Sequence, residues 1–436
     1  MLSEEGDSIV PKRRHEPDPA DVTTSARLYA RARQVMPWGT QTNAKRPDES
    51  LAGLMPFYID RAEGCRMQDV DGRWYIDYRM ALGPIILGYR HPVVDAAVQA
   101  QLQKGVLFSM ASPLEVEVAE RLTTLVPGLD QVRFMKTGND ANSASVRLTR
   151  AFTGRDHLVT CGYHGYSDWF ACGQGQGPAW CPREGNGVPA ALDALVTRIR
   201  YGDTDAAEAV FADRGEAIAA MLMVPADACG VADAAFVRRM RALTEAHGAL
   251  LIFDEILTGF RLAQGGGREY FGVAPDLSTY AKALANGYPL SAFGGRRDVM
   301  EKLNDVMITT TYAGETLSLA AARATLEILR EEPVLAHIWE MGTHLQFGFD
   351  VAAQTLGLQA AAIGLPPAVQ FCFSADAETD TAAHHIFFRE LYRRGIFAAR
   401  PFLLSYAHQP ADIDETVAAM QAALAVVAEA MPALST

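Results

Sequence analysis

Short apolar stretches alternate with amphipathic stretches through the middle of this chain. The apolar stretches have the length of buried strands and lie at 131–135, 157–161, 219–224 and 249–253. The amphipathic stretches have helical length and lie at 91–103, 113–125 and 141–152. This alternation predicts an α/β fold with a mostly parallel central sheet and helices on both faces. Ligands of such sheets bind at the carboxyl ends of the strands.

The pattern changes towards both ends of the chain. Residues 1–20 are charged and proline-rich and lack the apolar stretch of a signal peptide, so we expect a mobile tail. We then expect an N-terminal segment, a large domain and a smaller α+β C-terminal domain, over residues 21–85, 86–325 and 326–436.

Charge and cysteine usage narrow the range of partners. The net charge of the 436 residues is −13, whereas nucleic acids and anionic membranes attract clustered Lys and Arg. No apolar run has the length needed to cross a bilayer. The six cysteines show neither a CxxC pair nor the spacing of a metal finger. We therefore expect a cytoplasmic protein with free thiols, no metal, no nucleic acid or membrane partner, and a small-molecule ligand.

Two glycine-containing turns follow the first two predicted strands. In "FMKTGNDANSASVRLTR", Thr137, Gly138 and Asn139 lie between a strand and a helix, where backbone N–H groups and the helix dipole suit a phosphate. Helix capping by Thr137 or Asn139 explains the same residues. In "CGYHGYSDW", two glycines flank Tyr163 and His164, which suits stacking on a planar ligand. A turn that happens to carry aromatic residues explains this second motif equally well.

Two charged residues later in the chain lie among apolar neighbours. In "FDEILTGF", Asp254 ends an apolar strand and Ile256 points to the same side, while Glu255 faces away. A buried carboxylate needs a partner, and the protonated ring nitrogen of a pyridine cofactor is one; helix capping is the alternative. Lys282 lies among apolar and small residues, which predicts a lowered pKa and suits Schiff-base chemistry, unless it is an ordinary surface lysine.

The order and spacing of these motifs resemble the class III aminotransferases, which are fold-type-I pyridoxal-phosphate enzymes, and within them the glutamate-1-semialdehyde aminomutase branch. The corresponding segments are "DVDGRWYIDY", "RFMKTGNDAN", "YHG", "FDEILTGFR", "APDLSTYAKALANGYPL" and "TYAGETLSLAAA". They occur in family order, and the resemblance runs from about residue 29 to about residue 427.

The resemblance implies pyridoxal 5′-phosphate as cofactor, bound through Lys282. Asp254 would keep the ring nitrogen protonated, and Lys282 would move a proton between the substrate carbon and the cofactor. Tyr163 and Ile256 would lie on the two ring faces, with His164 beside them.

The same resemblance implies a phosphate site shared between subunits. The backbone N–H groups of Gly138 and Asn139 and the Thr137 hydroxyl would bind the phosphate, and the partner subunit's Thr311 would complete it. We therefore expect a homodimer with shared active sites.

The chain departs from the aminomutase pattern on the substrate side. Lys45 stands where that branch has an arginine for the substrate carboxylate, and "AARPFLLSYAH" lacks the glutamate of that branch. These departures favour an amino-sugar substrate, as in the 6′-aminotransferases of aminoglycoside biosynthesis, with an amino acid as amino donor. Asp227 and Glu315 are candidate contacts for a cationic substrate.

Three alternatives stay open at this point. They are a glutamate-1-semialdehyde 2,1-aminomutase, an epimerase or racemase with the same cofactor, and a cofactor-free scaffold that keeps the fold.

Overall fold

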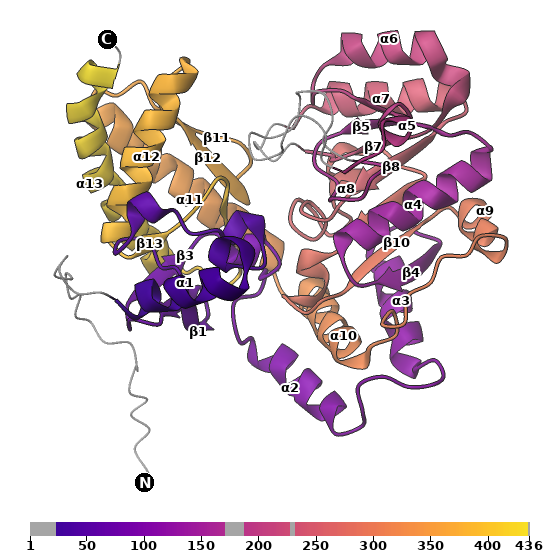
Figure 1. The fold of residues 1–436 in the computed structure, drawn as a ribbon, viewed down its shortest axis with the longest axis horizontal. Coiled ribbons are helices and arrows are strands. Elements are labelled where there is room, and N and C mark those ends of the chain that lie inside the picture. Colours follow the sequence, from indigo (N-terminus) through magenta and orange to yellow (C-terminus); the bar gives the residue numbers. More distant parts are fainter. Residues whose placement is uncertain (1–22, 171–186, 227–231, 435–436) are drawn as a thin grey trace.

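A seven-stranded sheet forms the centre of the larger of two lobes in the computed structural model, which describes residues 23–170, 187–226 and 232–434 (Figure 1). In spatial order its strands are β4 (Gln131–Met135), β10 (Ser291–Gly295), β9 (Leu277–Tyr280), β8 (Leu250–Asp254), β7 (Ile218–Met223), β5 (His157–Cys161) and β6 (Val196–Arg198). β10 is antiparallel to both of its neighbours, and the other pairs are parallel. The prediction of a mostly parallel sheet is confirmed, and the four expected strands lie within one residue of their predicted ends.

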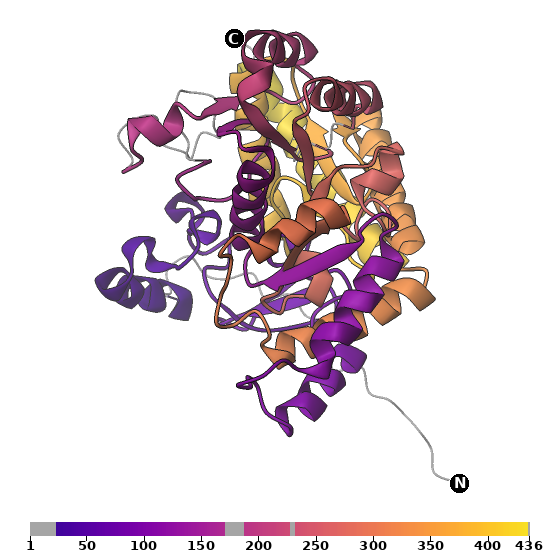
Figure 2. The same cartoon turned by 90° about the vertical axis from the view of Figure 1, so that its right-hand side faces the viewer.

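Helices cover both faces of this sheet, as expected. One face carries α4 (Gly138–Thr153) and α9 (Arg297–Met300), and the other carries α6 (Thr204–Arg214), α7 (Ala234–Ala246) and α8 (Gly267–Phe271). The helices that pack together beside β4 are α2 (Pro92–Leu102), α3 (Pro113–Leu125) and α10 (Thr316–Glu331). The short α5 (Ala190–Asp193) precedes β6. Figure 2 looks at this lobe, with the yellow C-terminal helices behind it.

Alternate residues of β8 pack on opposite faces of the sheet. Leu250 and Ile252 belong to the apolar cluster on the α4 face, whereas Leu251 and Phe253 belong to the cluster on the α7 face. Because side chains alternate along a strand, Asp254 at the end of β8 points to the α4 side. The strand therefore directs this carboxylate towards the N-terminal turns of α4.

The smaller lobe combines both ends of the described chain. One sheet contains β1 (Ile59–Glu63), β2 (Arg66–Asp69), β3 (Trp74–Asp77) and β13 (Ile396–Phe397). Another contains β11 (Ala361–Ile363), β12 (Ala368–Cys372) and β14 (Phe402–Leu403). The helices are α1 (Thr24–Val35), α11 (Val334–Thr355), α12 (Ala377–Arg393) and α13 (Pro410–Leu434). Because β3 pairs with β13, the N-terminal segment is part of the C-terminal lobe.

Short 3-10 helices occupy many of the connections. They are η1 (Pro37–Gly39), η2 (Asn43–Lys45), η3 (Glu49–Leu51), η4 (Met80–Leu82), η5 (Gly215–Ala217), η6 (Lys282–Ala285) and η7 (Glu301–Asn304). Two of them, η4 and η6, carry residues of the candidate site.

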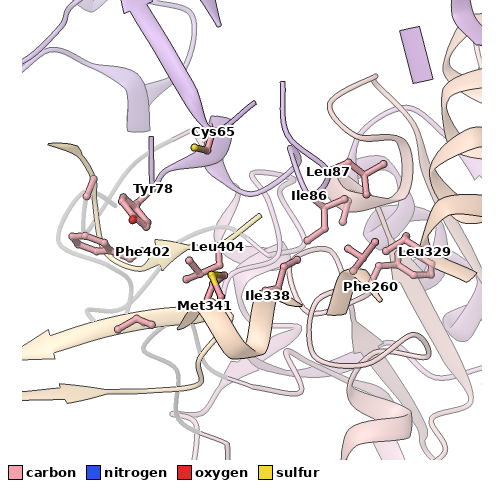
Figure 3. Packing of buried hydrophobic residues seen from close by; sticks show 14 of the residues in the cluster. Cys65, Tyr78, Ile86, Leu87, Phe260, Leu329, Ile338, Met341, Phe402 and Leu404 are labelled. Carbon is pink, nitrogen blue, oxygen red and sulfur yellow. The ribbon is translucent and has the colours of Figure 1, made fainter. Parts of the chain in front are cut away.

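One apolar cluster is continuous between the lobes. Figure 3 shows Ile86 of the N-terminal segment, Phe260 of the larger lobe, Ile338 of α11 and Leu404 of the C-terminal part within it. The domain limits expected from the sequence stay predictions, and the expected tail at 1–20 lies outside the described residues.

Two further expectations concern thiols and membranes. Within the described ranges, Cys65, Cys161 and Cys372 form no disulfide bond, and the other three cysteines lie outside those ranges. No described helix combines the length and the apolar character that crossing a bilayer requires.

Candidate active site

The turn between β4 and α4 presents the first backbone N–H groups of a helix. α4 begins at Gly138, three residues earlier than expected, because a capping box forms there. The Thr137 Oγ1 accepts a hydrogen bond from the Asp140 N–H (3.2 Å), and the Asp140 carboxylate accepts one from the Thr137 N–H (2.8 Å). The N–H groups of Gly138 and Asn139 have no acceptor within the helix, which leaves them for an anion. Capping and phosphate binding, which the sequence left as alternatives, are thus compatible.

The N-terminus of α4 lies directly against the end of β8. A Cβ atom on Gly138 would lie 2.4 Å from the Ile256 Cδ1, so any larger residue here would force the Ile256 side chain to move. The turn expected to bind phosphate and the residue expected to lie on a ring face are therefore neighbours.

The Asn139 side chain holds the loop that carries Tyr163. Its Oδ1 accepts hydrogen bonds from the backbone N–H groups of Tyr166 (2.9 Å) and Ser167 (3.1 Å). The Tyr163 ring is half exposed and meets the Phe170 ring edge-on at 5.8 Å between centroids. Burial, and then the negative charge of Asp254, raise the pKa of Tyr163.

The Asp254 carboxylate is buried and accepts three hydrogen bonds. Its Oδ2 accepts from the Asn142 Nδ2 (2.8 Å) and faces the His164 Nδ1 (2.7 Å), and its Oδ1 accepts from the Ile256 N–H (3.1 Å). The Thr279 hydroxyl fixes the amide of Asn142 by donating to its Oδ1 (2.7 Å). Residues from β8, α4, β9 and the loop after β5 thus orient one carboxylate.

His164 lies buried between two acceptor oxygens. Its Nε2 is 3.2 Å from the Cys161 carbonyl oxygen, and its Nδ1 faces the Asp254 Oδ2. These two contacts fix the orientation of the imidazole ring against the carboxylate. His164 therefore positions Asp254, while its expected contact with the cofactor stays a prediction.

Glu255 faces away from Asp254, as expected. Its Oε2 accepts hydrogen bonds from the Thr258 hydroxyl (2.5 Å) and the Gly267 N–H (2.9 Å), and its Oε1 accepts from the Arg268 N–H (3.2 Å). Burial raises the pKa of Glu255 to about 7. Glu255 thus fixes the connection that follows β8.

Lys282 begins the short helix η6 in a left-handed backbone conformation, with φ 45°. Such strain in a non-glycine residue is typical of functional sites. Burial lowers the pKa of Lys282 to about 8; the Asp254 carboxylate opposes this shift and the Arg261 guanidinium adds to it. The lowered pKa predicted from its apolar surroundings is confirmed.

A strained segment of the smaller lobe lies beside Lys282. Met80, Ala81 and Leu82 have φ values of 43°, 55° and 76°. A Cβ atom on Gly83 would lie 3.7 Å from the Lys282 Cδ. Residues 80–83 therefore form a wall of the site.

The buried Asp77 carboxylate holds this strained segment. Its Oδ1 accepts from the N–H groups of Arg79 (2.7 Å) and Met80 (3.1 Å), and its Oδ2 accepts from the Tyr89 hydroxyl (2.7 Å). The Arg79 guanidinium donates to the Ala44 carbonyl, which brings the loop with Lys45 against the same segment.

The other residues predicted to bind substrate or phosphate are not brought together in the structure described. The Glu315 carboxylate caps α10 and pairs with the Lys136 Nζ at 3.0 Å. Lys45 and Thr311 are exposed, and Asp227 lies outside the described residues. The pairing with Lys136 satisfies the charge of Glu315, so a contact between Glu315 and a cationic substrate stays a prediction without structural support.

Sequence reasoning missed Asn142, Thr279, Asp77 and Arg79. A signal for Asn142 was present, because an asparagine inside a helix interior needs a local reason. The roles of the other three residues depend on contacts between distant parts of the chain, which the sequence alone does not show.

Comparisons with known proteins agree with this geometry. Residues 50–356 match the family model described as Aminotransferase class-III. The glutamate-1-semialdehyde 2,1-aminomutase of Thermomicrobium roseum is 37% identical over 427 residues, covering 93% of this chain and 98% of that protein. The enzyme of the same name from Syntrophobacter fumaroxidans is 35% identical over 413 residues, covering 90% and 95%.

Two solved structures have the same fold over most of their length. The PLP internal aldimine form of the FumI protein of Sphingopyxis sp. MTA144 has a TM-score of 0.84 and 30% identity, covering 94% of this chain and 99% of that chain. An omega-transaminase from Sphaerobacter thermophilus has a TM-score of 0.85 and 26% identity, with the same coverage.

Proposed function

Because this chain belongs to the class III aminotransferase family, we propose that it moves an amino group on a small substrate that carries a carboxylate, with glutamate 1-semialdehyde as the first candidate. The chain is a pyridoxal-phosphate-dependent enzyme of fold type I. The observation that carries the substrate proposal is the contact between the Arg79 guanidinium and the Lys45 loop. Arg79 directly precedes the segment 80–83, whose Gly83 lies beside Lys282.

The residues of this site fit the cofactor. The N-terminus of α4 suits the phosphate, Asp254 suits a protonated ring nitrogen, and Gly138 leaves room for Ile256 beside the ring. When bound, the cofactor supplies a ring that withdraws electrons from the substrate carbon. The Lys282 Nζ, neutral above a pKa of about 8, can accept a proton from that carbon and return it.

Two cations support a substrate with a carboxylate. Burial lowers the pKa of Arg79, so an anionic ligand beside its guanidinium would be stabilised. Lys45 extends from the loop that Arg79 contacts. The aminomutase names of relatives that match over at least 90% of the chain favour the same substrate class over an amino sugar. Glu315 is paired with Lys136, so the structure supports the proposal of a cationic sugar substrate less than the sequence did.

We also infer a homodimer with a shared site. Thr311 is exposed in the turn that precedes α10. The start of α10 contacts the loop between α2 and α3, because the Thr316 N–H donates to the Val106 carbonyl (2.8 Å). Exposed apolar side chains lie in this loop and in the segment before α10; they are Val106, Leu107, Phe108, Met110, Met307 and Tyr312. Such a patch is typical of a protein interface.

Turnover of glutamate 1-semialdehyde tests the substrate proposal. The holoenzyme should form 5-aminolevulinate, and Arg79→Met should raise KM at least about tenfold, because it removes a charge-assisted contact. Arg73→Met is the matched control, since Arg73 also donates to a backbone carbonyl, that of Gly53 (2.6 Å).

The alternatives give different outcomes in the same assay. Amination of a 6′-oxo amino sugar with an amino-acid donor, without turnover of the semialdehyde, would contradict the proposal and support the amino-sugar aminotransferase. Inversion of an amino-bearing carbon without any carbonyl product would point to an epimerase or racemase.

A further inference from the structure

Arg261 is an arginine buried at the junction of the two lobes. Its side chain is 1% exposed. Its Nη1 donates to the carbonyl oxygens of Leu404 (2.9 Å) and Pro367 (3.4 Å), and its Nη2 donates to that of Gly83 (2.8 Å). Among the described residues, no carboxylate forms an ion pair with it, so three backbone carbonyls are its counterparts. Burial lowers the pKa of Arg261 to about 10.

The three carbonyls belong to segments far apart in the chain. Gly83 ends the strained segment 80–83, Leu404 follows β14, and Pro367 precedes β12. Arg261 itself follows Phe260 in the connection between β8 and β9 of the larger lobe. Phe260 and Leu404 lie in the same apolar cluster (Figure 3), so one side chain joins the N-terminal and C-terminal parts of the smaller lobe to the larger lobe.

These segments reach the Lys282 side chain. A Cβ atom on Gly83 would lie 2.9 Å from the Leu257 Cδ1, 3.3 Å from the Leu403 Cδ1 and 3.7 Å from the Lys282 Cδ. The Gly83 carbonyl that Arg261 binds therefore belongs to a residue beside Lys282. The Leu404 carbonyl belongs to the residue directly after Leu403, whose side chain lies beside Gly83. A shift of either segment would change the space around the lysine.

We propose that Arg261 is a positioning residue that holds residues 80–83 and 402–405 against the larger lobe, and that its unbalanced positive charge helps to keep Lys282 ready to release its proton. A planar guanidinium reaches several carbonyls with fixed geometry, which an ammonium cannot reproduce. The charged groups that act on Lys282 among the described residues are Asp254, which stabilises its charged form, and Arg261, which disfavours it.

Two substitutions separate the geometric role from the charge. Arg261→Lys keeps the charge and loses the planar fork, whereas Arg261→Met loses both. Arg155→Lys is the matched control, because the Arg155 Nη1 also donates to three carbonyls, those of Gly215 (3.5 Å), Ile218 (3.1 Å) and His247 (2.8 Å). These lie at the opposite, amino ends of the strands.

Two measurements on the full-length holoenzyme test the proposal. Hydrogen exchange followed by mass spectrometry reports the opening of residues 80–83 and 402–405. The pH midpoint of the absorbance change of the cofactor bound at Lys282 reports the electrostatic environment of that nitrogen.

The expected results differ between the variants. Both Arg261 variants should exchange roughly tenfold faster at both segments, the factor expected when hydrogen bonds to a charged group are lost. The midpoint should move to higher pH in Arg261→Met and stay near the wild-type value in Arg261→Lys. Arg155→Lys should change neither quantity. Wild-type exchange at both segments in Arg261→Lys would overturn the positioning role, even if Arg261→Met fails to fold, and an unmoved midpoint in folded Arg261→Met would overturn the electrostatic role.

Discussion

At the scale of single residues, adjacent carboxylates have different environments. One oxygen of Asp254 contacts both Asn142 and His164, and these contacts orient the carboxylate. Glu255 meets the Thr258 hydroxyl and backbone N–H groups, and burial raises its pKa to about 7. Side chains alternate between the two faces of the sheet along β8, so Asp254 faces α4 and Glu255 faces the other way.

Asp254→Asn should lower kcat at least about a hundredfold while leaving the fold intact, because the ring nitrogen loses its anionic partner. Steady-state kinetics and thermal unfolding measure the two effects. Glu255→Gln is the neighbouring control and should keep activity within a few-fold. Normal turnover by Asp254→Asn would show that this carboxylate has no part in the chemistry.

Lys282 should set the pH dependence of cofactor loading. The neutral amine is the form that attacks the cofactor aldehyde, and it is populated as the pH rises through the lowered pKa of about 8, rather than through the ordinary value of 10.5. The loading rate of cofactor-free protein, followed by absorbance, should therefore rise with pH and level off above a midpoint of about 8. A rate that keeps rising towards the ordinary value would contradict a buried Lys282.

At the scale of elements, the strands were predictable and the contacts between them were not. β4, β5, β7 and β8 are fully or largely apolar runs between turns, so their limits followed from the sequence within one residue. Asp254 could be identified because it ends such a strand, and Lys282 because it lies among apolar and small residues. The order of the two also fits a family pattern. The amide that orients Asp254 is 112 positions away in the chain, and the carbonyl that Arg261 binds at Gly83 is 178 positions away. Local patterns carry no signal for such pairs.

The start of α4 offers a prediction at this scale. Asn139→Ala removes the acceptor for the Tyr166 and Ser167 N–H groups and should loosen the loop with Tyr163, which weakens cofactor binding by roughly tenfold. Asp140→Ala removes only the capping box and should lower the free energy of unfolding by about 1 kcal/mol. Fluorescence titration with the cofactor and denaturant unfolding separate the two; equal cofactor affinity in Asn139→Ala and wild type would exclude the loop-holding role.

At the scale of the whole molecule, the site lies where several parts of the chain meet. The larger lobe supplies Asp254 and Lys282, and the smaller lobe supplies the strained segment 80–83 beside them. The apolar cluster that continues between the lobes packs these parts against one another. The proposed second subunit would add Thr311, an exposed residue in the described chain.

The proposed dimer predicts that a charge at Phe108 disrupts dimerisation, whereas a charge at the exposed Phe347 does not. Phe108→Asp should convert the dimer to monomer and weaken cofactor binding, because the partner subunit's Thr311 would no longer reach the phosphate. Phe347→Asp on α11 is the control, since Phe347 is 68% exposed and Phe108 is 46% exposed, yet only Phe108 lies in the proposed patch. Sedimentation equilibrium gives the mass; a monomeric wild-type holoenzyme would contradict the shared site.

The most direct test of the proposed active site is the identity of the lysine that carries the cofactor. Borohydride reduction of the holoenzyme, followed by digestion and mass spectrometry of the peptides, fixes the cofactor on its lysine and locates it. We predict the phosphopyridoxyl group on Lys282, and no labelled peptide in Lys282→Ala. A label on another lysine of the wild-type protein, or none at all, would contradict the assignment of the site.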